Sequence, residues 1–122
     1  MKHAPGFLKV VEEAKTRVRE VTVAEARARL AANPAAVLVD VREENEWAAG
    51  HAADAVPLGK GVLERDIETR IPAKDAELIL YCGGGFRSVL AADMAQKMGY
   101  TNVTSLVGGF REMNAAGWPM AQ

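Results

Sequence analysis

The sequence contains a single cysteine, Cys82, and only two histidines, His3 and His51. One cysteine cannot form an intramolecular disulfide, and so few thiols and imidazoles exclude a tetrahedral zinc site of the multi-cysteine type. We therefore expect no resident metal ion. A free thiol remains a thiol in a reducing compartment, so the sequence predicts a cytoplasmic location.

Net charge and long apolar runs are also lacking. The formal net charge is −1, so no overall field favours binding to nucleic acid or to an acidic membrane surface. Nowhere do about 18 apolar residues follow one another, which would be needed to span a bilayer. Lys9 and the acids after it interrupt the first apolar stretch, so a signal peptide is not expected. We expect partners that are neither nucleic acids nor membranes.

What the sequence does contain is typical of one globular domain. Its 122 residues are 49% apolar and 25% charged, which suits a single hydrophobic core. Apolar residues recur at helical spacing near the N-terminus and predict an amphipathic helix over residues 7–19. We therefore divide the chain into an N-terminal helical extension, residues 1–19, and a domain over residues 20–122.

Helical and extended patterns alternate along the rest of the chain. A short β-prone stretch, Val21 to Val23, is followed by a helix that Thr22 can cap. The other predicted strands cover residues 36–41, 55–58, 77–81 and 103–107. The predicted helices cover residues 23–32, 43–49, 61–70, 88–98 and 110–116. This alternation predicts an α/β domain with a mostly parallel sheet.

The segment with the clearest chemistry follows the predicted strand over residues 77–81. It reads Cys82-Gly83-Gly84-Gly85-Phe86-Arg87 and leads into a helix that begins with Ser88. Ligands of open α/β sheets bind at the carboxyl ends of strands, where this cysteine stands. Three glycines let successive N–H groups converge on one point, and the helix adds its free N–H groups and the positive end of its dipole. We expect a loop that favours an exposed thiolate over the thiol and that binds the oxyanion of a substrate, with Arg87 supplying a cation. The alternative is that Cys82 is a small buried apolar residue beside a flexible turn.

Other polar residues leave two interpretations open. Asp40 and Arg42 follow a strand tip, so they could surround the site, but Arg42 could instead pair with Glu43 or Glu46 and hold the scaffold. His51 could act as an acid or base, or could make a structural hydrogen bond after Gly50. Trp47 and Trp118 are expected in the core.

Three segments together give the chain a family resemblance. Asp40-Val41-Arg42-Glu43 with Gly50-His51 looks like an N-terminal signature, and Gly108-Gly109-Phe110 with Gly117-Trp118-Pro119 looks like a C-terminal one. With the cysteine loop between them, they resemble the rhodanese homology domain over roughly residues 20 to 120.

The resemblance implies a five-stranded parallel sheet with helices on both faces and sulfur transfer through a cysteine persulfide. The family's catalytic cysteine corresponds to Cys82. Its substrate-binding loop corresponds to Gly83, Gly84, Gly85, Phe86, Arg87 and Ser88. The implied partners are a small sulfur donor, such as thiosulfate or a persulfide, and a thiol or cyanide acceptor. No organic cofactor is implied.

Two rival functions share parts of this pattern. A cysteine phosphatase or arsenate reductase also uses a cysteine, an anion-binding loop and an arginine. Phosphatase loops have five residues between the cysteine and the arginine, and this chain has four between Cys82 and Arg87. The smaller ring suits one sulfur atom better than a tetrahedral oxyanion. The second rival is a non-catalytic rhodanese-like module that only binds a partner, but loss of the cysteine, its usual sign, is absent here. A carrier that relays persulfide sulfur to a partner protein would have the same sequence, so a protein acceptor stays open.

Overall fold

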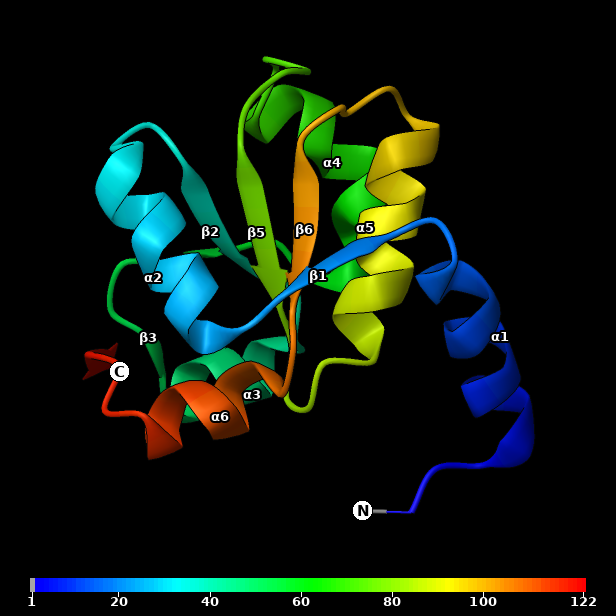
Figure 1. Cartoon of the computed structure of the whole chain (residues 1–122), viewed down its shortest axis with the longest axis horizontal. Coiled ribbons are helices and arrows are strands. Elements are labelled where there is room, and N and C mark those ends of the chain that lie inside the picture. The colour runs from blue at the N-terminus through cyan, green and yellow to red at the C-terminus, as the bar shows by residue number, and fades with distance from the viewer. Residues whose placement is uncertain (1) are drawn as a thin grey trace.

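The computed structural model describes residues 2–122 and contains a five-stranded sheet in which every strand pair is parallel. The strands lie in the order β1-β6-β5-β2-β4 (Figure 1). Their bounds are Arg19–Val21 for β1, Val37–Asp40 for β2, Val56–Pro57 for β4, Leu78–Tyr81 for β5 and Val103–Leu106 for β6. This order places β5, which precedes Cys82, at the centre of the sheet. The predicted α/β fold and five-stranded sheet are confirmed.

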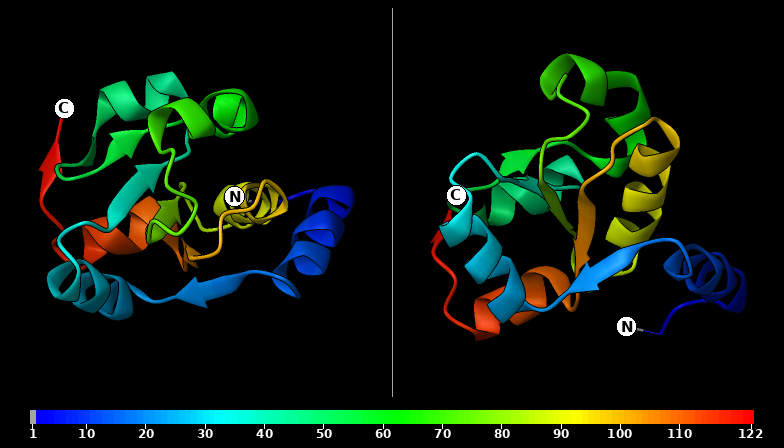
Figure 2. Two further views of the ribbon diagram at one scale, coloured as in Figure 1. Left: turned by 90° about the horizontal axis from the view of Figure 1, so that it is seen from above. Right: turned by 45° about the horizontal axis from the view of Figure 1, so that its top comes forward.

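Helices cover both faces of this sheet, as Figure 2 shows. One face carries α1 (Pro5–Lys15), α4 (Leu63–Arg70) and α5 (Arg87–Lys97). The other carries α2 (Val23–Ala32) and α6 (Gly109–Ala115), and α3 (Glu44–Ala49) lies at the carboxyl ends of the strands. A 3₁₀ turn over Lys60–Val62 precedes α4.

The side chains of β5 show why the strand needs cover on both sides. Leu78 and Leu80 pack into the core beneath α5, whereas Ile79 and Tyr81 pack into the core beneath α6. All four are fully buried. Successive strand residues point to opposite faces, so a continuous apolar run is what a strand buried on both faces requires.

The N-terminal helix α1 is shorter than predicted and packs against the domain. It ends at Lys15, and not at residue 19, because Arg19–Val21 pairs with β6 as strand β1. Val11 and Ala14 of α1 are buried against α5. Arg17 then binds both carboxylate oxygens of Asp93 on α5, at 2.9 and 2.8 Å. The helix is therefore held to the domain by apolar contact and by an ion pair.

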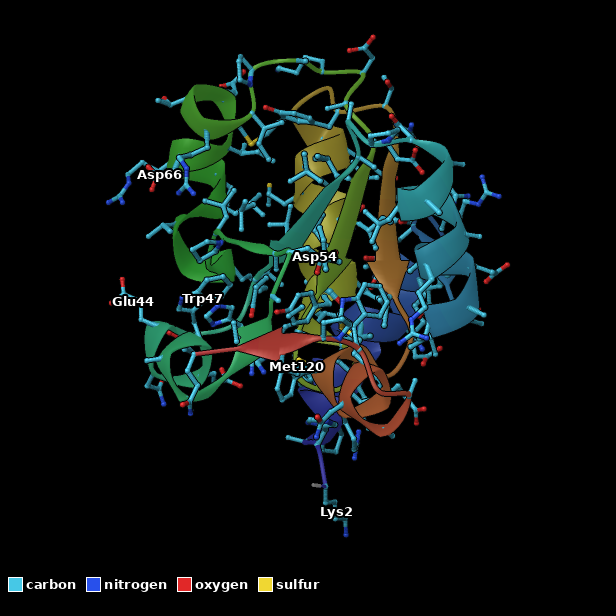
Figure 3. The ribbon with its side chains drawn as sticks, turned by 90° about the vertical axis from the view of Figure 1, so that its left-hand side faces the viewer. Lys2, Glu44, Trp47, Asp54, Asp66 and Met120 are labelled. Carbon is cyan, nitrogen blue, oxygen red and sulfur yellow. The ribbon has the colours of Figure 1, made fainter. Side chains whose placement is uncertain are left out.

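A second, two-stranded sheet was not predicted. In it β3 (His51–Ala52) pairs antiparallel with β7 (Met120–Ala121), which ties the C-terminus to the segment after α3. Figure 3 shows Met120 on β7 and Trp47 on α3 on the same side of the molecule. Trp118, just before β7, is buried and donates a hydrogen bond to Asp54 at 3.1 Å. Trp47 is only half-buried, so its predicted place in the core is wrong.

The helices of residues 2–122 are all too short or too polar to cross a lipid bilayer.

Candidate active site

Cys82 directly follows β5, and the loop after it folds back over the sulfur atom. The backbone N–H of Gly85 lies 3.1 Å from Cys82 Sγ, and the N–H of Ser88 lies 3.4 Å from it. Both N–H groups belong to the loop or to the first turn of α5, whose positive dipole end faces the sulfur. Two backbone N–H groups of the glycine loop and of α5 thus converge on the sulfur.

A pair of buried hydroxyl groups completes the surroundings of the sulfur. Ser88 Oγ lies 3.5 Å from Cys82 Sγ and 2.8 Å from Ser105 Oγ on β6. Neither serine is accessible to solvent. Ser105 therefore positions the Ser88 hydroxyl beside the sulfur. It is a site residue that sequence reasoning missed, and its signal was a pair of polar residues, Thr104 and Ser105, in a strand that is buried throughout.

The thiol is buried, although the sequence predicted an exposed one. Only 1% of Cys82 is accessible, because the glycine loop and α5 enclose the sulfur. Cys82 nevertheless lines a pocket of about 640 Å³, together with Gly83, Gly84, Phe86 and Arg87 of the predicted loop. The loop cysteine is thus buried and still borders a pocket.

Gly85 is the loop residue whose backbone requires glycine. Its φ is +96°, in the left-handed region that side chains avoid. A β-carbon there would lie 2.9 Å from the backbone nitrogen of Gly108. The loop and the Gly108-Gly109 segment therefore pack backbone against backbone, which links two motifs that are far apart in the sequence.

Arg87 lines the pocket but is already paired. Its guanidinium makes two hydrogen bonds to the carboxylate of Glu46 on α3, at 2.7 and 3.0 Å. The Arg87 guanidinium lowers the pKa of Glu46 from 4.5 to about 2, so the carboxylate remains charged at neutral pH. The expected role of Arg87 in substrate binding stays a prediction. Its ion pair with Glu46 was not predicted.

Arg42 has a different partner from the two expected. Its guanidinium binds both carboxylate oxygens of Asp40 and donates to the carbonyl of Gly50 at 2.7 Å. It pairs with neither Glu43 nor Glu46, because Asp40 is held within reach at the tip of the same strand and Glu46 is taken by Arg87.

The Asp40–Arg42 pair supports the strand that carries Cys82. The Tyr81 hydroxyl donates to Asp40 at 2.6 Å, and burial followed by this hydrogen bond raises the pKa of Tyr81, so it stays protonated. The pair does not line the pocket that contains Cys82 but lines a separate pocket. Its role toward the site stays a prediction.

His51 also lies outside the Cys82 pocket. Its Nδ1 is 2.9 Å from the carbonyl of Trp47, and the two rings stack with centroids 3.5 Å apart. This geometry matches the structural interpretation of His51 rather than the acid–base one.

The pocket is also lined by residues that no sequence pattern had assigned to the site. His3 and Phe7, from the N-terminal segment, line the pocket beside Phe86, and Arg111 of α6 lines it beside Gly84. Figure 1 shows that the N-terminal segment begins at the end of the molecule where the loop after β5 lies. Nothing in the spacing of the first residues predicts which helix they would cover.

Comparisons with known proteins show which family the chain resembles. The sequence model of the rhodanese-like domain matches residues 22–116. A sulfurtransferase of Allochromatium vinosum is 32% identical over 84% of this chain and 94% of its own length. A tRNA uridine(34) hydroxylase of Erwinia tasmaniensis is 33% identical over 66% of this chain, which spans only 24% of that enzyme.

A solved structure resembles the whole chain, including α1. It is a protein of unknown function from Rhodopseudomonas palustris, described as a possible tyrosine phosphatase. The TM-score is 0.83 at 32% identity, over 99% of this chain and 98% of that one. The family match covers strands β2, β4, β5 and β6, the cysteine loop and the segment that packs against it, so this chain belongs to the rhodanese-like domain family.

Proposed function

We propose that the protein is a sulfurtransferase that carries a sulfane sulfur as a persulfide of Cys82. The observation that carries this proposal is the convergence of the Gly85 and Ser88 N–H groups on Cys82 Sγ, at 3.1 and 3.4 Å. Donors aimed at the sulfur itself stabilise a thiolate and the charge that develops during transfer. The sulfurtransferase relative, matched over almost its whole length, supports the same chemistry.

The reaction has two steps. The Cys82 thiolate attacks the outer sulfur of thiosulfate, the S–S bond of the donor breaks, and sulfite leaves with the bonding electron pair. The anionic persulfide is then attacked at its outer sulfur by a thiolate or by cyanide. This restores the Cys82 thiolate and releases a persulfide or thiocyanate. The sequence is covalent catalysis of the ping-pong type, and each step conserves charge without an oxidant.

The supporting residues divide into two groups under this mechanism. Ser88, positioned by Ser105, places its hydroxyl beside the sulfur and can hydrogen-bond to it in the thiolate and persulfide states. The Arg87–Glu46 ion pair fixes the far end of the loop to α3, which keeps the N–H groups aimed at the sulfur. The acceptor is a low-molecular-weight thiol or a thiol of a partner protein, and either requires a reducing compartment such as the cytoplasm.

The phosphatase alternative fits this loop less well. Only four residues separate Cys82 from Arg87, and the Arg87 guanidinium is held by two hydrogen bonds to Glu46. The two loop N–H groups nearest the cysteine are directed at Sγ and not at a space above it. A phosphoryl group would need these donors for its own oxygens.

Intact-protein mass spectrometry tests the proposal directly. After incubation with thiosulfate, the wild-type protein should gain the mass of one sulfur atom and release one sulfite. Subsequent cyanide should remove that mass and produce thiocyanate. Cys82→Ala is the control and should show neither change. An adduct that is equal in wild type and Cys82→Ala, or absent from both, would refute the persulfide mechanism.

A further inference from the structure

The pocket above Cys82 is larger than thiosulfate requires. Its volume is about 640 Å³, within the roughly 300–1,000 Å³ of pockets that enclose drug-sized organic ligands. Thiosulfate is a small inorganic ion and would leave most of this space to water. Besides the cysteine loop and the Arg87–Glu46 ion pair, the pocket is lined by aromatic side chains and by a second arginine.

One side of the pocket is an aromatic wall formed by His3, Phe7 and Phe86. The ring centroids of His3 and Phe86 lie 4.7 Å apart in an edge-to-face arrangement, and those of His3 and Phe7 lie 5.2 Å apart. Phe7 and Phe86 are 6.3 Å apart. All three are half-buried, so they pack on one another and still present surface to the pocket. Such a surface favours contact with an apolar or aromatic group.

The pocket also contains a cation that is free to bind a ligand, Arg111. An Nη of Arg111 lies 3.0 Å from where a β-carbon of Gly84 would stand, so this guanidinium lies over the cysteine loop. Within residues 2–122, no ion pair ties it to a carboxylate, whereas Arg87 makes two hydrogen bonds to Glu46. The Arg111 backbone is fixed by its N–H, which donates to the carbonyl of Gly83 at 3.2 Å. Arg111 thus has a positioned backbone and an uncommitted charge.

We infer that Arg111 and the aromatic wall form a subsite for an organic sulfane donor that has an anionic head and an apolar body. The inference rests on the proposed sulfur transfer through Cys82 and names its donor class, such as an aryl thiosulfonate. The Cys82 thiolate attacks the sulfane sulfur of the donor, the S–S bond breaks, and the aryl sulfinate leaves with the electron pair. Arg111 binds the sulfonyl oxygens, and the ring of the donor lies against Phe7 and His3. The N-terminal segment, which lies before the family match, is therefore part of the active site.

Two donors that differ only in their body test the aromatic wall. Benzenethiosulfonate and methanethiosulfonate each carry one negative charge and one sulfane sulfur. Their kcat/KM values are measured as thiocyanate formation with cyanide as acceptor. Because the two sulfinates differ as leaving groups, the ratio of the two kcat/KM values is compared between variants and not interpreted alone.

Phe7→Ala and His3→Ala should each lower this ratio in favour of the methyl donor, by a factor on the order of three to ten. Leu8→Ala is the matched control, because Leu8 lies on the same helix but is exposed and does not line the pocket. Its ratio should equal that of the wild type. If Phe7→Ala destabilises α1, His3→Ala still tests the wall, since His3 precedes the helix. An unchanged ratio in both variants would overturn the aromatic half of the inference.

Arginine substitutions test whether Arg111 binds the anionic head of the donor. Arg111→Ala should raise KM for both thiosulfonates on the order of tenfold, and Arg111→Lys should restore part of the loss. Arg65→Ala removes the same charge from an arginine that does not line this pocket, and it should leave KM unchanged. Arg87→Ala should lower kcat, because it releases the loop from Glu46. An increase of KM in Arg87→Ala, with Arg111→Ala unaffected, would assign the anion site to Arg87 and overturn this half.

The failure of this inference can be distinguished from a failure of the proposed function. If both thiosulfonates load Cys82 and the ratio is insensitive to the wall, only the donor class is wrong. If no donor loads Cys82 by mass spectrometry, the sulfur-transfer mechanism itself is wrong.

Discussion

The contact between Gly109 and the cysteine loop gives a sharp prediction about stability and activity. Gly109 has a φ of +52°, and a β-carbon there would lie 2.3 Å from the carbonyl oxygen of Cys82. That oxygen accepts the N–H of Phe110 at 2.7 Å, and the carbonyl of Gly83 accepts the N–H of Arg111 at 3.2 Å. The substitution Gly109→Ala must therefore move the backbone of the catalytic loop, the start of α6, or both.

The expected cost follows from these contacts. A left-handed alanine costs about 1 kcal/mol. Separating the two segments weakens two backbone hydrogen bonds, each worth about 1 kcal/mol, and leaves their groups partly unsatisfied. We expect Gly109→Ala to lower the free energy of unfolding by about 3–4 kcal/mol, a large part of the roughly 5–15 kcal/mol typical of a domain. Because the displaced carbonyl belongs to Cys82, sulfur loading by thiosulfate should fall as well.

Alanine variants of two other glycines distinguish the cost of a left-handed backbone from the cost of the contact with the cysteine loop. The free energy of unfolding of each variant is measured by urea denaturation. Gly117 has a φ of +76° with open space around it, so Gly117→Ala should cost only the backbone term of about 1 kcal/mol. Gly61 has open space and no positive φ, so Gly61→Ala should change stability little. If Gly109→Ala costs no more than Gly117→Ala, the proposed backbone contact does not control the loop and the reasoning is refuted.

Further predictions concern Glu46, the choice of reaction and oxidation. The pKa of Glu46 in the folded protein is about 2, below its usual 4.5, so its ion pair with Arg87 contributes fully above about pH 4.5 and is lost as the pH falls through about 2. Glu46→Gln should therefore lower the free energy of unfolding at pH 7 by about 1 kcal/mol, allowing for solvent screening, and urea denaturation should show the gap closing between pH 4.5 and 2. Hydrolysis of p-nitrophenyl phosphate should be negligible, because the loop is one residue shorter than a phosphatase loop. Turnover that depends on Cys82 would reverse our ranking of the two reactions. Peroxide should inactivate the sulfur-free protein irreversibly, since no second cysteine can rescue the oxidised thiol. Protein loaded with thiosulfate should regain activity after thiol treatment, and equal permanent losses in both forms would contradict this.

Local sequence patterns predicted most of the fold. The helix over residues 23–32 has the predicted bounds, because Thr22 and Glu25 form a capping box and Pro34 follows its end. The central strands were evident because strands buried on both faces need unbroken apolar runs. The two-residue strands β3 and β7 could not be predicted, since neither has a pattern of its own and each exists only by pairing with the other.

The arrangement of the cysteine loop could be predicted from the sequence, but its contacts with other elements could not. The strand tip, the glycines and the start of α5 lie within one short segment, so their arrangement around Cys82 follows from local geometry. The partners of the arginines do not, because they depend on how separate elements pack. Glu46 was expected near Arg42, but α3 directs it to Arg87, and Asp40 at the tip of β2 takes its place. Arg111 and Phe7 reach the pocket from elements whose docking no spacing encodes.

The burial of Cys82 is easier to reconcile with a protein that carries sulfur as a persulfide than with an enzyme whose thiol attacks a bulky substrate directly. Cys82 lines the pocket with only 1% of the residue accessible. A persulfide adds one S–S bond of about 2.05 Å, so the transferable atom stands farther from the backbone than the thiol does. Under the proposed mechanism, the loop N–H groups hold the inner sulfur at the floor while the outer sulfur is presented to the acceptor. The sulfur-free protein should consequently react slowly with bulky alkylating reagents, and the persulfide form should react faster at its outer sulfur. Equal alkylation rates of the two forms, followed by mass spectrometry, would show that burial does not control access to this site.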